Sequence, residues 1–382
     1  MSRFNRRVEQ IPPSGIRRFF DLVLDAKDII SLGVGEPDFV TPWQVREQVF
    51  YALEQGRTSY TSNWGITELR QETATYLNTR FGTRFDRDEI LITVGVSEGI
   101  DLVLRTILNE GDELILPEPT YVCYRPLTEL AGGVVRAVST PSLKVTADAI
   151  ERAVTPTTKA ILLSYPCNPT GYTIDKTEIL KIGEIVRKKG IWLISDEIYA
   201  ELTYEGEHFS VGALPGLKEQ VIVLNGFSKA FAMTGWRLGY IAASRDFLTQ
   251  AVKIHQYAAL CAPIMAQYGA LESLRRGIAE MEEMKKSYWR RRNYMYDALN
   301  SIGLSVAKPE GAFYIFPSIH STGKTSEEFA VGLLEQEKVA VVPGDVFGMG
   351  GEGHVRICYA TDFNLLKESV RRIDRYIKAA KK

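Results

Sequence analysis

The stretch that decides the fold is Val221-Ile222-Val223-Leu224-Asn225-Gly226-Phe227-Ser228-Lys229-Ala230-Phe231-Ala232-Met233-Thr234-Gly235-Trp236-Arg237-Leu238-Gly239. Its first four residues are apolar and mostly β-branched, which predicts a strand buried on both faces, as in a parallel sheet. Lys229 follows that strand among small and apolar neighbours, so loss of solvent is expected to lower its pKa and make its amine a nucleophile. Arg237 lies between Gly235 and Gly239, which let its planar guanidinium approach an anion closely. The residues alone also allow a surface lysine and an arginine that only pairs with a nearby acid.

A nucleophilic amine beside an anion-binding arginine suggests that a phosphorylated carbonyl compound binds here. The whole pattern from Gly226 to Gly239 resembles the cofactor-attachment site of the class I, aspartate aminotransferase-like, enzymes that use pyridoxal phosphate. Further matches follow in that family's chain order from Gly35 to Arg356. The resemblance implies fold type I, an α/β protein. Its large domain holds a mostly parallel, seven-stranded sheet covered by helices, and a smaller α/β domain accompanies it.

The composition is that of an ordinary globular protein and argues against several other classes. A chain of 382 residues suits two domains. With 45% hydrophobic and 24% charged residues and a net charge of −1, it offers no electrostatic case for nucleic acid or an anionic membrane as a partner. No apolar run suits a signal peptide or a membrane span. The four cysteines and four histidines show no metal-ligand spacing, so we expect no metal site and a reducing, cytoplasmic location.

The order of the expected elements divides the chain. Strands and helices alternate between residues 176 and 243, which predicts the parallel sheet. The stretch from about Asp246 to Ser301 has helical spacing and is interpreted as the helix that bridges the two domains. Strands and helices alternate again from Gly311 to a last helix over 365–378. We therefore expect an N-terminal segment that belongs partly to the small domain over residues 1–42, a large cofactor-binding domain over 43–282, and the small domain over 283–382.

Two segments ahead of the sheet carry expected contacts. A loop rich in glycine and proline holds Gly35, which in the resembled family lies against the substrate carboxylate, and Ile16 would lie on the flap that covers the site. Tyr60 lies in a polar loop before a helix over 68–81. An aromatic residue in such a loop usually serves local packing. The resemblance implies instead that Tyr60 crosses a homodimer interface and binds the partner's cofactor phosphate.

A strand over 90–94 turns into a helix through Gly95-Val96-Ser97-Glu98. A helix N-terminus offers unpaired amides and the positive end of the helix dipole, which suits a phosphate, although most such turns bind nothing. The resemblance places the cofactor phosphate at Gly95, Val96 and Ser97. Glu98 would repel a phosphate, so we expect its side chain to turn away and cap the helix.

Four residues near strand ends match contacts of the cofactor ring. Tyr121 is either a core aromatic or, by resemblance, the ring that stacks on the pyridine. Asn168 begins the turn Asn-Pro-Thr-Gly. By resemblance, Asn168 and Tyr199 both bind the phenolic oxygen of the cofactor, and Asn168 also contacts the substrate. Asp196 ends an apolar strand and is either a helix N-cap or the partner of a protonated pyridine nitrogen.

Two further positions complete the predicted site. Ser228, next to the lysine, would join Arg237 at the phosphate, whereas Gly226 stands where many relatives have a serine that binds this phosphate. Arg356 lies in a short apolar strand, where an unpaired arginine is costly. It therefore forms a structural ion pair or, by resemblance, grips the substrate α-carboxylate.

The resemblance implies a transaminase that moves an amino group from an L-amino acid (aspartate, aromatic or related) to a 2-oxo acid such as 2-oxoglutarate. Lys229 would hold pyridoxal phosphate as an imine and then act as general base and acid, with Asp196 and Tyr199 as the other catalytic residues. The alternative is a β-lyase or a cyclopropane-forming synthase acting on sulfur-bearing amino acids. The sequence assigns no charged partner to a distal substrate carboxylate.

Overall fold

The computed structural model of the protein describes residues 3–16 and 28–380. Its centre is a seven-stranded sheet in which β8 runs antiparallel to its neighbours β2 and β7, while the other neighbours are parallel. In spatial order the strands are β2 (Ile90–Thr93), β8 (Gly239–Ala243), β7 (Val221–Gly226), β6 (Trp192–Asp196), β5 (Thr158–Ser164), β3 (Glu113–Glu118) and β4 (Val134–Ser139). The mostly parallel sheet predicted from the sequence is thereby confirmed.

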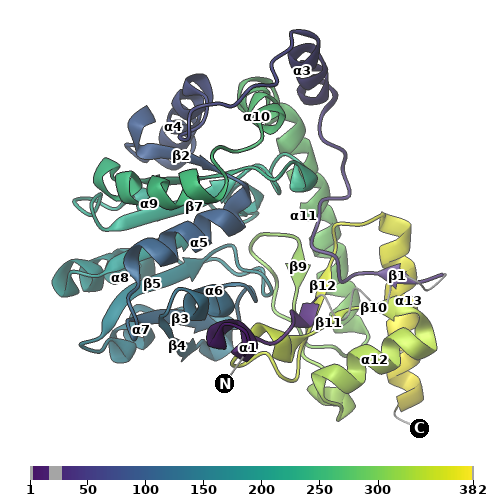
Figure 1. Ribbon diagram of the computed structural model, residues 1–382. Coiled ribbons are helices and arrows are strands. Elements are labelled where there is room, and N and C mark those ends of the chain that lie inside the picture. The colour runs from purple at the N-terminus through teal and green to yellow at the C-terminus, as the bar shows by residue number, and fades with distance from the viewer. Residues whose placement is uncertain (1–2, 17–27, 381–382) are drawn as a thin grey trace.

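Helices cover both faces of this sheet, which explains the continuous apolar runs of its strands. In β7, Ile222 and Leu224 pack into the core shared with α5 and α9, whereas Val221 and Val223 pack into the core of the opposite face. Figure 1 shows α5 and α9 side by side in front of the sheet. The described helices before the C-terminal unit are α1 (Arg6–Gln10), α3 (Trp43–Glu54), α4 (Thr67–Phe81), α5 (Gly95–Ile107), α6 (Tyr124–Leu130), α7 (Ala147–Ala153), α8 (Lys176–Lys189), α9 (Arg245–Ala258) and α10 (Ile264–Arg276).

The C-terminal part is a smaller α/β unit, seen at the right of Figure 1. Its antiparallel sheet has the order β11-β12-β9, and β1 of the N-terminal segment pairs in parallel with β10. Its elements are β1 (Ile30–Ser31), β9 (Tyr314–Ile315), β10 (Val339–Ala340), β11 (Val342–Pro343), β12 (Val355–Cys358), α11 (Ile278–Ser301), α12 (Ser326–Glu337) and α13 (Phe363–Ala380). Residues 339–343 form two short strands with different partners, because β10 pairs with β1 and β11 pairs with β12. The domain limits after residues 42 and 282 stay a prediction.

The predicted bridging helix over about 246–301 is wrong as a single element. Three helices, α9, α10 and α11, occupy this stretch. Pro263 is the N-cap of α10 and disfavours helical backbone in the residue before it, and Leu260 adopts a left-handed conformation with φ of 65°. Gly277 separates α10 from α11, so only α11 runs between the sheet and the C-terminal unit (Figure 1). No helix in the described part of the chain is long and apolar enough to cross a membrane.

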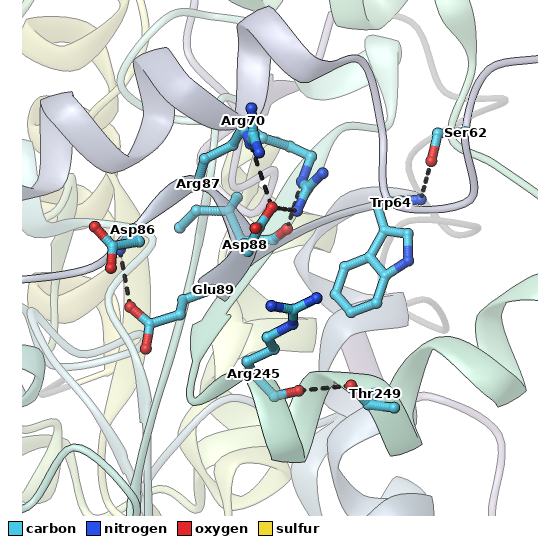
Figure 2. A network of polar contacts seen from close by, with 10 residues as sticks. Ser62, Trp64, Arg70, Asp86, Arg87, Asp88, Glu89, Arg245 and Thr249 are labelled. Carbon is cyan, nitrogen blue, oxygen red and sulfur yellow. Dashed lines mark hydrogen bonds and ion pairs between the residues drawn. The ribbon is translucent and has the colours of Figure 1, made fainter.

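A polar network fastens α4 to the start of β2 (Figure 2). Arg70 of α4 donates through Nε to the carbonyl oxygen of Ile90 at 3.0 Å and through Nη2 to Asp88 at 3.1 Å. Arg87 donates to the same carboxylate at 3.2 Å, and the guanidinium carbon of Arg70 lies 5.3 Å from the Trp64 ring centroid. These contacts fix β2, which leads directly into the turn at the start of α5.

Candidate active site

A cavity of about 510 Å³ lies where the central strands end and the C-terminal unit begins. Its wall combines residues from the ends of β6 and β7, the first turn of α5, the N-terminal segment, β9 and β12. Open α/β sheets bind ligands beyond the carboxyl ends of their strands. All the predicted site residues line this cavity except Gly95 and Tyr60.

Lys229 lies just beyond β7, half-buried at the cavity wall. Its Nζ donates a hydrogen bond to the carbonyl oxygen of Gly35 at 2.7 Å. Loss of solvent lowers the pKa of Lys229 to about 8, and the positive charges of Arg356 and Arg237 act in the same direction. Its amine is therefore neutral in an appreciable fraction of molecules near neutral pH, as a nucleophile requires. The sequence alone also allowed Lys229 to be a surface lysine, and the structure rules this out.

Asp196 ends β6, the strand next to β7, and its side chain is buried. The Tyr124 hydroxyl donates to its Oδ2 at 2.8 Å, and the Ile198 N–H donates to its Oδ1 at 3.1 Å. Burial raises the pKa of Asp196 to about 6, although both hydrogen bonds oppose this shift. Asp196 is not the helix N-cap that the sequence alone also allowed, because the helical turn that follows begins at Ala200 with Tyr199 as its cap. Among the described residues no cation pairs with this carboxylate, which leaves it suited to a cationic ligand.

The turn into α5 brings backbone amides and Arg237 together. Val96 and Ser97 lie in the first helical turn, where amides have no acceptor within the helix. Gly95 has φ of +75°, and a Cβ added there would lie 2.7 Å from Nη2 of Arg237. Arg237 is held by a hydrogen bond of 2.9 Å from Nη1 to the carbonyl oxygen of Thr234. Gly95 therefore stands behind the cavity wall and makes room for the guanidinium.

Glu98 caps the start of α5 as expected, and its side chain does not line the cavity. Its Oε2 accepts a hydrogen bond from the Val94 N–H, and its Oε1 lies 2.8 Å from Nδ1 of His255. The helix therefore gains a cap, and the carboxylate is tied to the protein rather than to the cavity.

The glycine at position 226 has a structural cause. Gly226 of β7 lies opposite Gly239 of β8, and a Cβ on Gly226 would come within 2.9 Å of the Cα of Gly239 and of the carbonyl oxygen of Leu238. Both are backbone atoms that cannot move aside singly. The close approach of the two strands therefore disfavours a serine at this position, and Ser228, which lines the cavity, is the nearby hydroxyl.

Arg356 is 2% exposed in β12. Its Nη1 donates to the side-chain oxygen of Asn168 at 2.8 Å, and its Nη2 donates to the carbonyl oxygen of Gly33. Its Nε has no hydrogen-bond partner in the described part of the chain, and no carboxylate there pairs with it. The structural ion pair that the sequence also allowed is thus absent from the described residues, and a buried donor faces no acceptor.

The comparisons with known proteins agree with this geometry. Residues 27–373 match the sequence profile described as "Aminotransferase class I and II". The chain belongs to this family. YugH of Bacillus subtilis (strain 168), which carries a provisional name as an aminotransferase, is 53% identical over 97% of each chain. Aromatic-amino-acid aminotransferase 2 of Thermococcus litoralis is 41% identical over 98% of each chain. The aspartate aminotransferase of Thermus thermophilus, solved with maleate, is 34% identical, with a TM-score of 0.95 over 98% of this chain and 100% of that one.

The protein is a pyridoxal-phosphate-dependent aminotransferase of fold type I. The described residues fit this cofactor, because they offer a nucleophilic amine, a buried carboxylate without a cation, and a helix N-terminus beside an arginine. Because these relatives carry aminotransferase names, they do not favour the alternative of a β-lyase or a cyclopropane-forming synthase. No cluster of three or more metal-binding side chains occurs among the described residues.

Two tyrosines of this aminotransferase site escaped the sequence interpretation. Tyr124 donates to Asp196, and its spacing of three from Tyr121 at a helix start could have indicated that the two rings meet; they lie 5.8 Å apart. Tyr314 of β9 shares a hydrogen bond of 2.7 Å with the Tyr199 hydroxyl, and its ring centroid lies 4.6 Å from the Arg356 guanidinium carbon. Nothing in the local sequence around Tyr314 signals that contact.

Ile16 reaches the cavity of its own chain, whereas Tyr60 does not. Ile16 is buried against Phe316, Val342 and Phe347 and reaches the cavity wall. Tyr60 is 84% exposed and does not reach the cavity of its own chain. Its role across an interface stays a prediction.

Proposed function

We propose that this aminotransferase attaches pyridoxal phosphate through Lys229 and uses the same amine to move the Cα proton of the substrate. The observation that carries the proposal is that Lys229 and Asp196, from the ends of neighbouring strands, face one cavity. Bound pyridoxal phosphate supplies an aldehyde for attachment and a pyridine ring that accepts electron density from the substrate. Asp196 holds the proton on the ring nitrogen, since its buried carboxylate then gains the cation that the described residues do not provide.

The other cofactor contacts follow from the wall of the cavity. Arg237 and the amides of Val96 and Ser97 neutralise the phosphate, which agrees with the anion preference of a helix N-terminus. The remaining assignments are Gly95 and Ser228 to the phosphate, Tyr121 to the ring face, and Asn168 and Tyr199 to the phenolic oxygen. The hydrogen bond between the Tyr199 and Tyr314 hydroxyls supports the last of these, because it fixes the position of the Tyr199 oxygen.

Arg356 binds the substrate α-carboxylate. This role is supported by its unpartnered Nε and by neutral oxygens on its other nitrogens, which orient the guanidinium without neutralising it. Gly35 and Ile16 close over the substrate from the N-terminal segment, and Asn168 lies beside it. Once released from the cofactor, the Lys229 amine, with its lowered pKa, can accept and return a proton near neutral pH.

We propose further that the preferred donors are L-amino acids with uncharged, aromatic or aliphatic, side chains. The basic residues on the described cavity wall are Lys229, Arg237 and Arg356, and each already has a role. No basic residue of the described wall is therefore left to pair with a carboxylate on the substrate side chain. The same wall carries the acidic Glu36 and the apolar Val34.

The test is a panel of amino donors mixed singly with the loaded enzyme. Loss of the visible absorbance of the bound cofactor reports amino transfer, and added 2-oxoglutarate should restore it. Tyrosine, phenylalanine and alanine are expected to react faster than aspartate. Fastest reaction with aspartate would contradict the assignment of the cations. Release of ammonia and pyruvate without an acceptor would point to lyase chemistry instead.

We also propose a cytoplasmic homodimer in which Tyr60 reaches the partner's phosphate. It is supported by apolar side chains left exposed around this region, namely Tyr60 at 84%, Tyr257 at 88% and Leu260 at 39%. Asn63 donates to the Leu260 carbonyl oxygen at 2.7 Å, so these loops adjoin. Light scattering gives the mass in solution, and a monomeric enzyme with full cofactor affinity would refute the shared site.

The cytoplasmic location is supported by the four cysteines, which carry no disulfide and so suit a reducing compartment.

A further inference from the structure

A carboxylate lies in the first turns of the helix assigned to the phosphate. Glu98 follows Val96 and Ser97 in α5, and its Oε2 accepts the backbone N–H of Val94, the residue before the helix. The side chain is therefore folded back over the same turn whose amides are assigned to the phosphate. A carboxylate this close to a dianion opposes binding unless its charge is compensated or held away.

His255 provides that compensation from another helix. Its side chain, on α9, is 0% exposed, and Nδ1 lies 2.8 Å from Glu98 Oε1. A carboxylate oxygen accepts hydrogen bonds, so this contact requires the tautomer that carries its hydrogen on Nδ1. The second ring nitrogen, Nε2, has no hydrogen-bond partner among the described residues. Within that part of the chain, the polar contacts of this buried ring are therefore made to Glu98.

We propose that Glu98 and His255 are positioning residues for the cofactor phosphate. His255 holds the Glu98 carboxylate away from the phosphate, and Glu98 holds the turn at Val94 so that the amides of Val96 and Ser97 face it. The inference rests on the phosphate site proposed above. Neither Glu98 nor His255 lines the cavity, so both act through the backbone of the turn.

The test compares pyridoxal phosphate with pyridoxal, which lacks the phosphate. Full-length enzyme freed of cofactor is titrated with each compound, and binding is followed by absorbance. For Glu98→Ala and His255→Ala, we expect the dissociation constant of pyridoxal phosphate to rise about tenfold and that of pyridoxal to change less than about twofold. Glu98→Gln keeps an acceptor for the Val94 N–H and removes the charge, so wild-type affinity is expected for both.

Glu328→Ala is the matched control. Glu328 also caps a helix N-terminus, accepting the Thr325 N–H at 2.9 Å at the start of α12, and it does not line the cavity. This variant loses a helix cap as Glu98→Ala does, so it shows what general loss of stability does to cofactor binding. Its affinities for both compounds are expected to equal those of the wild type.

Wild-type affinity for pyridoxal phosphate in both alanine variants overturns the proposal. Parallel loss of affinity for both compounds also overturns it, because the damage is then not confined to the phosphate. If one alanine variant does not unfold cooperatively on heating, the other alanine variant is compared with Glu98→Gln. The ratio of its dissociation constants for pyridoxal phosphate and pyridoxal then decides. A wild type that binds pyridoxal as tightly as pyridoxal phosphate would refute the phosphate site itself and this inference with it.

Discussion

The two walls of the cavity are built in different ways. On the cofactor side, β6 and β7 are buried strands of five and six residues, and Asp196 and Lys229 stand at their carboxyl ends. On the substrate side, β9 and β11 have two residues each, and Arg356 is placed by hydrogen bonds to Gly33 and Asn168, far away in sequence. Longer strands of the seven-stranded sheet place the first wall, whereas short paired strands and side-chain hydrogen bonds to distant segments together place the second. Changes in the first should alter chemistry, and changes in the second should alter substrate binding.

The largest effect is expected from Lys229→Ala on the cofactor side. Loss of the amine removes both the attachment point and the proton carrier, so turnover should fall by at least about 10³-fold. The visible absorbance of attached cofactor should disappear as well. Lys253→Ala is the control, because Lys253 contacts Gln250 on the exposed side of α9. Unchanged turnover in Lys229→Ala would refute the attachment site.

On the substrate side, Arg356→Ala should raise KM about 10²-fold for every amino acid donor alike, because each loses a charge-assisted carboxylate contact. Cofactor affinity should stay at the wild-type value, which separates the two walls. Steady-state kinetics with several donors and a cofactor titration measure both. Damage confined to a single donor would make Arg356 a residue that recognises the side chain.

The pH dependence of stability tests the burial of Asp196 on the cofactor side. Burial raises the pKa of Asp196 to about 6, so the folded protein without cofactor keeps a proton that the unfolded chain releases at lower pH. Its contribution to stability should therefore fall by about 3 kcal/mol as pH rises from about 4 to about 6 and stay constant above that. Asp196→Asn should remove this part of the slope in urea unfolding. An unchanged slope in the variant would show that Asp196 does not titrate in this window.

The smallest effect is expected from Gly226→Ser, which introduces the hydroxyl that the family resemblance led us to expect at this position. The added atoms meet backbone of Gly239 and Leu238, so the free energy of unfolding should fall by about 1–3 kcal/mol without tighter cofactor binding. Gly235→Ser is the control for unfolding alone, because an added Cβ there meets no atom within 4 Å but Gly235 lines the cavity. Tighter cofactor binding in Gly226→Ser would mean that the two strands can separate.

The same contrast explains how far the sequence could predict the molecule. Asp196 and Lys229 can be predicted to lie at the cavity, because an ionisable residue at or just after the end of an apolar strand is a local pattern. Tyr314 was missed because its contact with Tyr199 joins residues far apart in the chain. The break in the expected bridging helix was missed because the helical spacing continues on both sides of Pro263, although the proline itself was a visible signal. Gly226 was noticed, but its cause became visible only with β8 beside β7.

The neutral oxygens that hold Arg356 have a practical consequence. The carbonyl of Gly33 and the amide of Asn168 orient the guanidinium but leave its positive charge intact. Any small anion will therefore be drawn toward it, including acetate, citrate or sulfate from an assay mixture. Such buffers should behave as competitive inhibitors of the amino acid, and rising ionic strength should weaken substrate capture. Michaelis constants for this enzyme are comparable only when they are measured in the same buffer and at the same ionic strength.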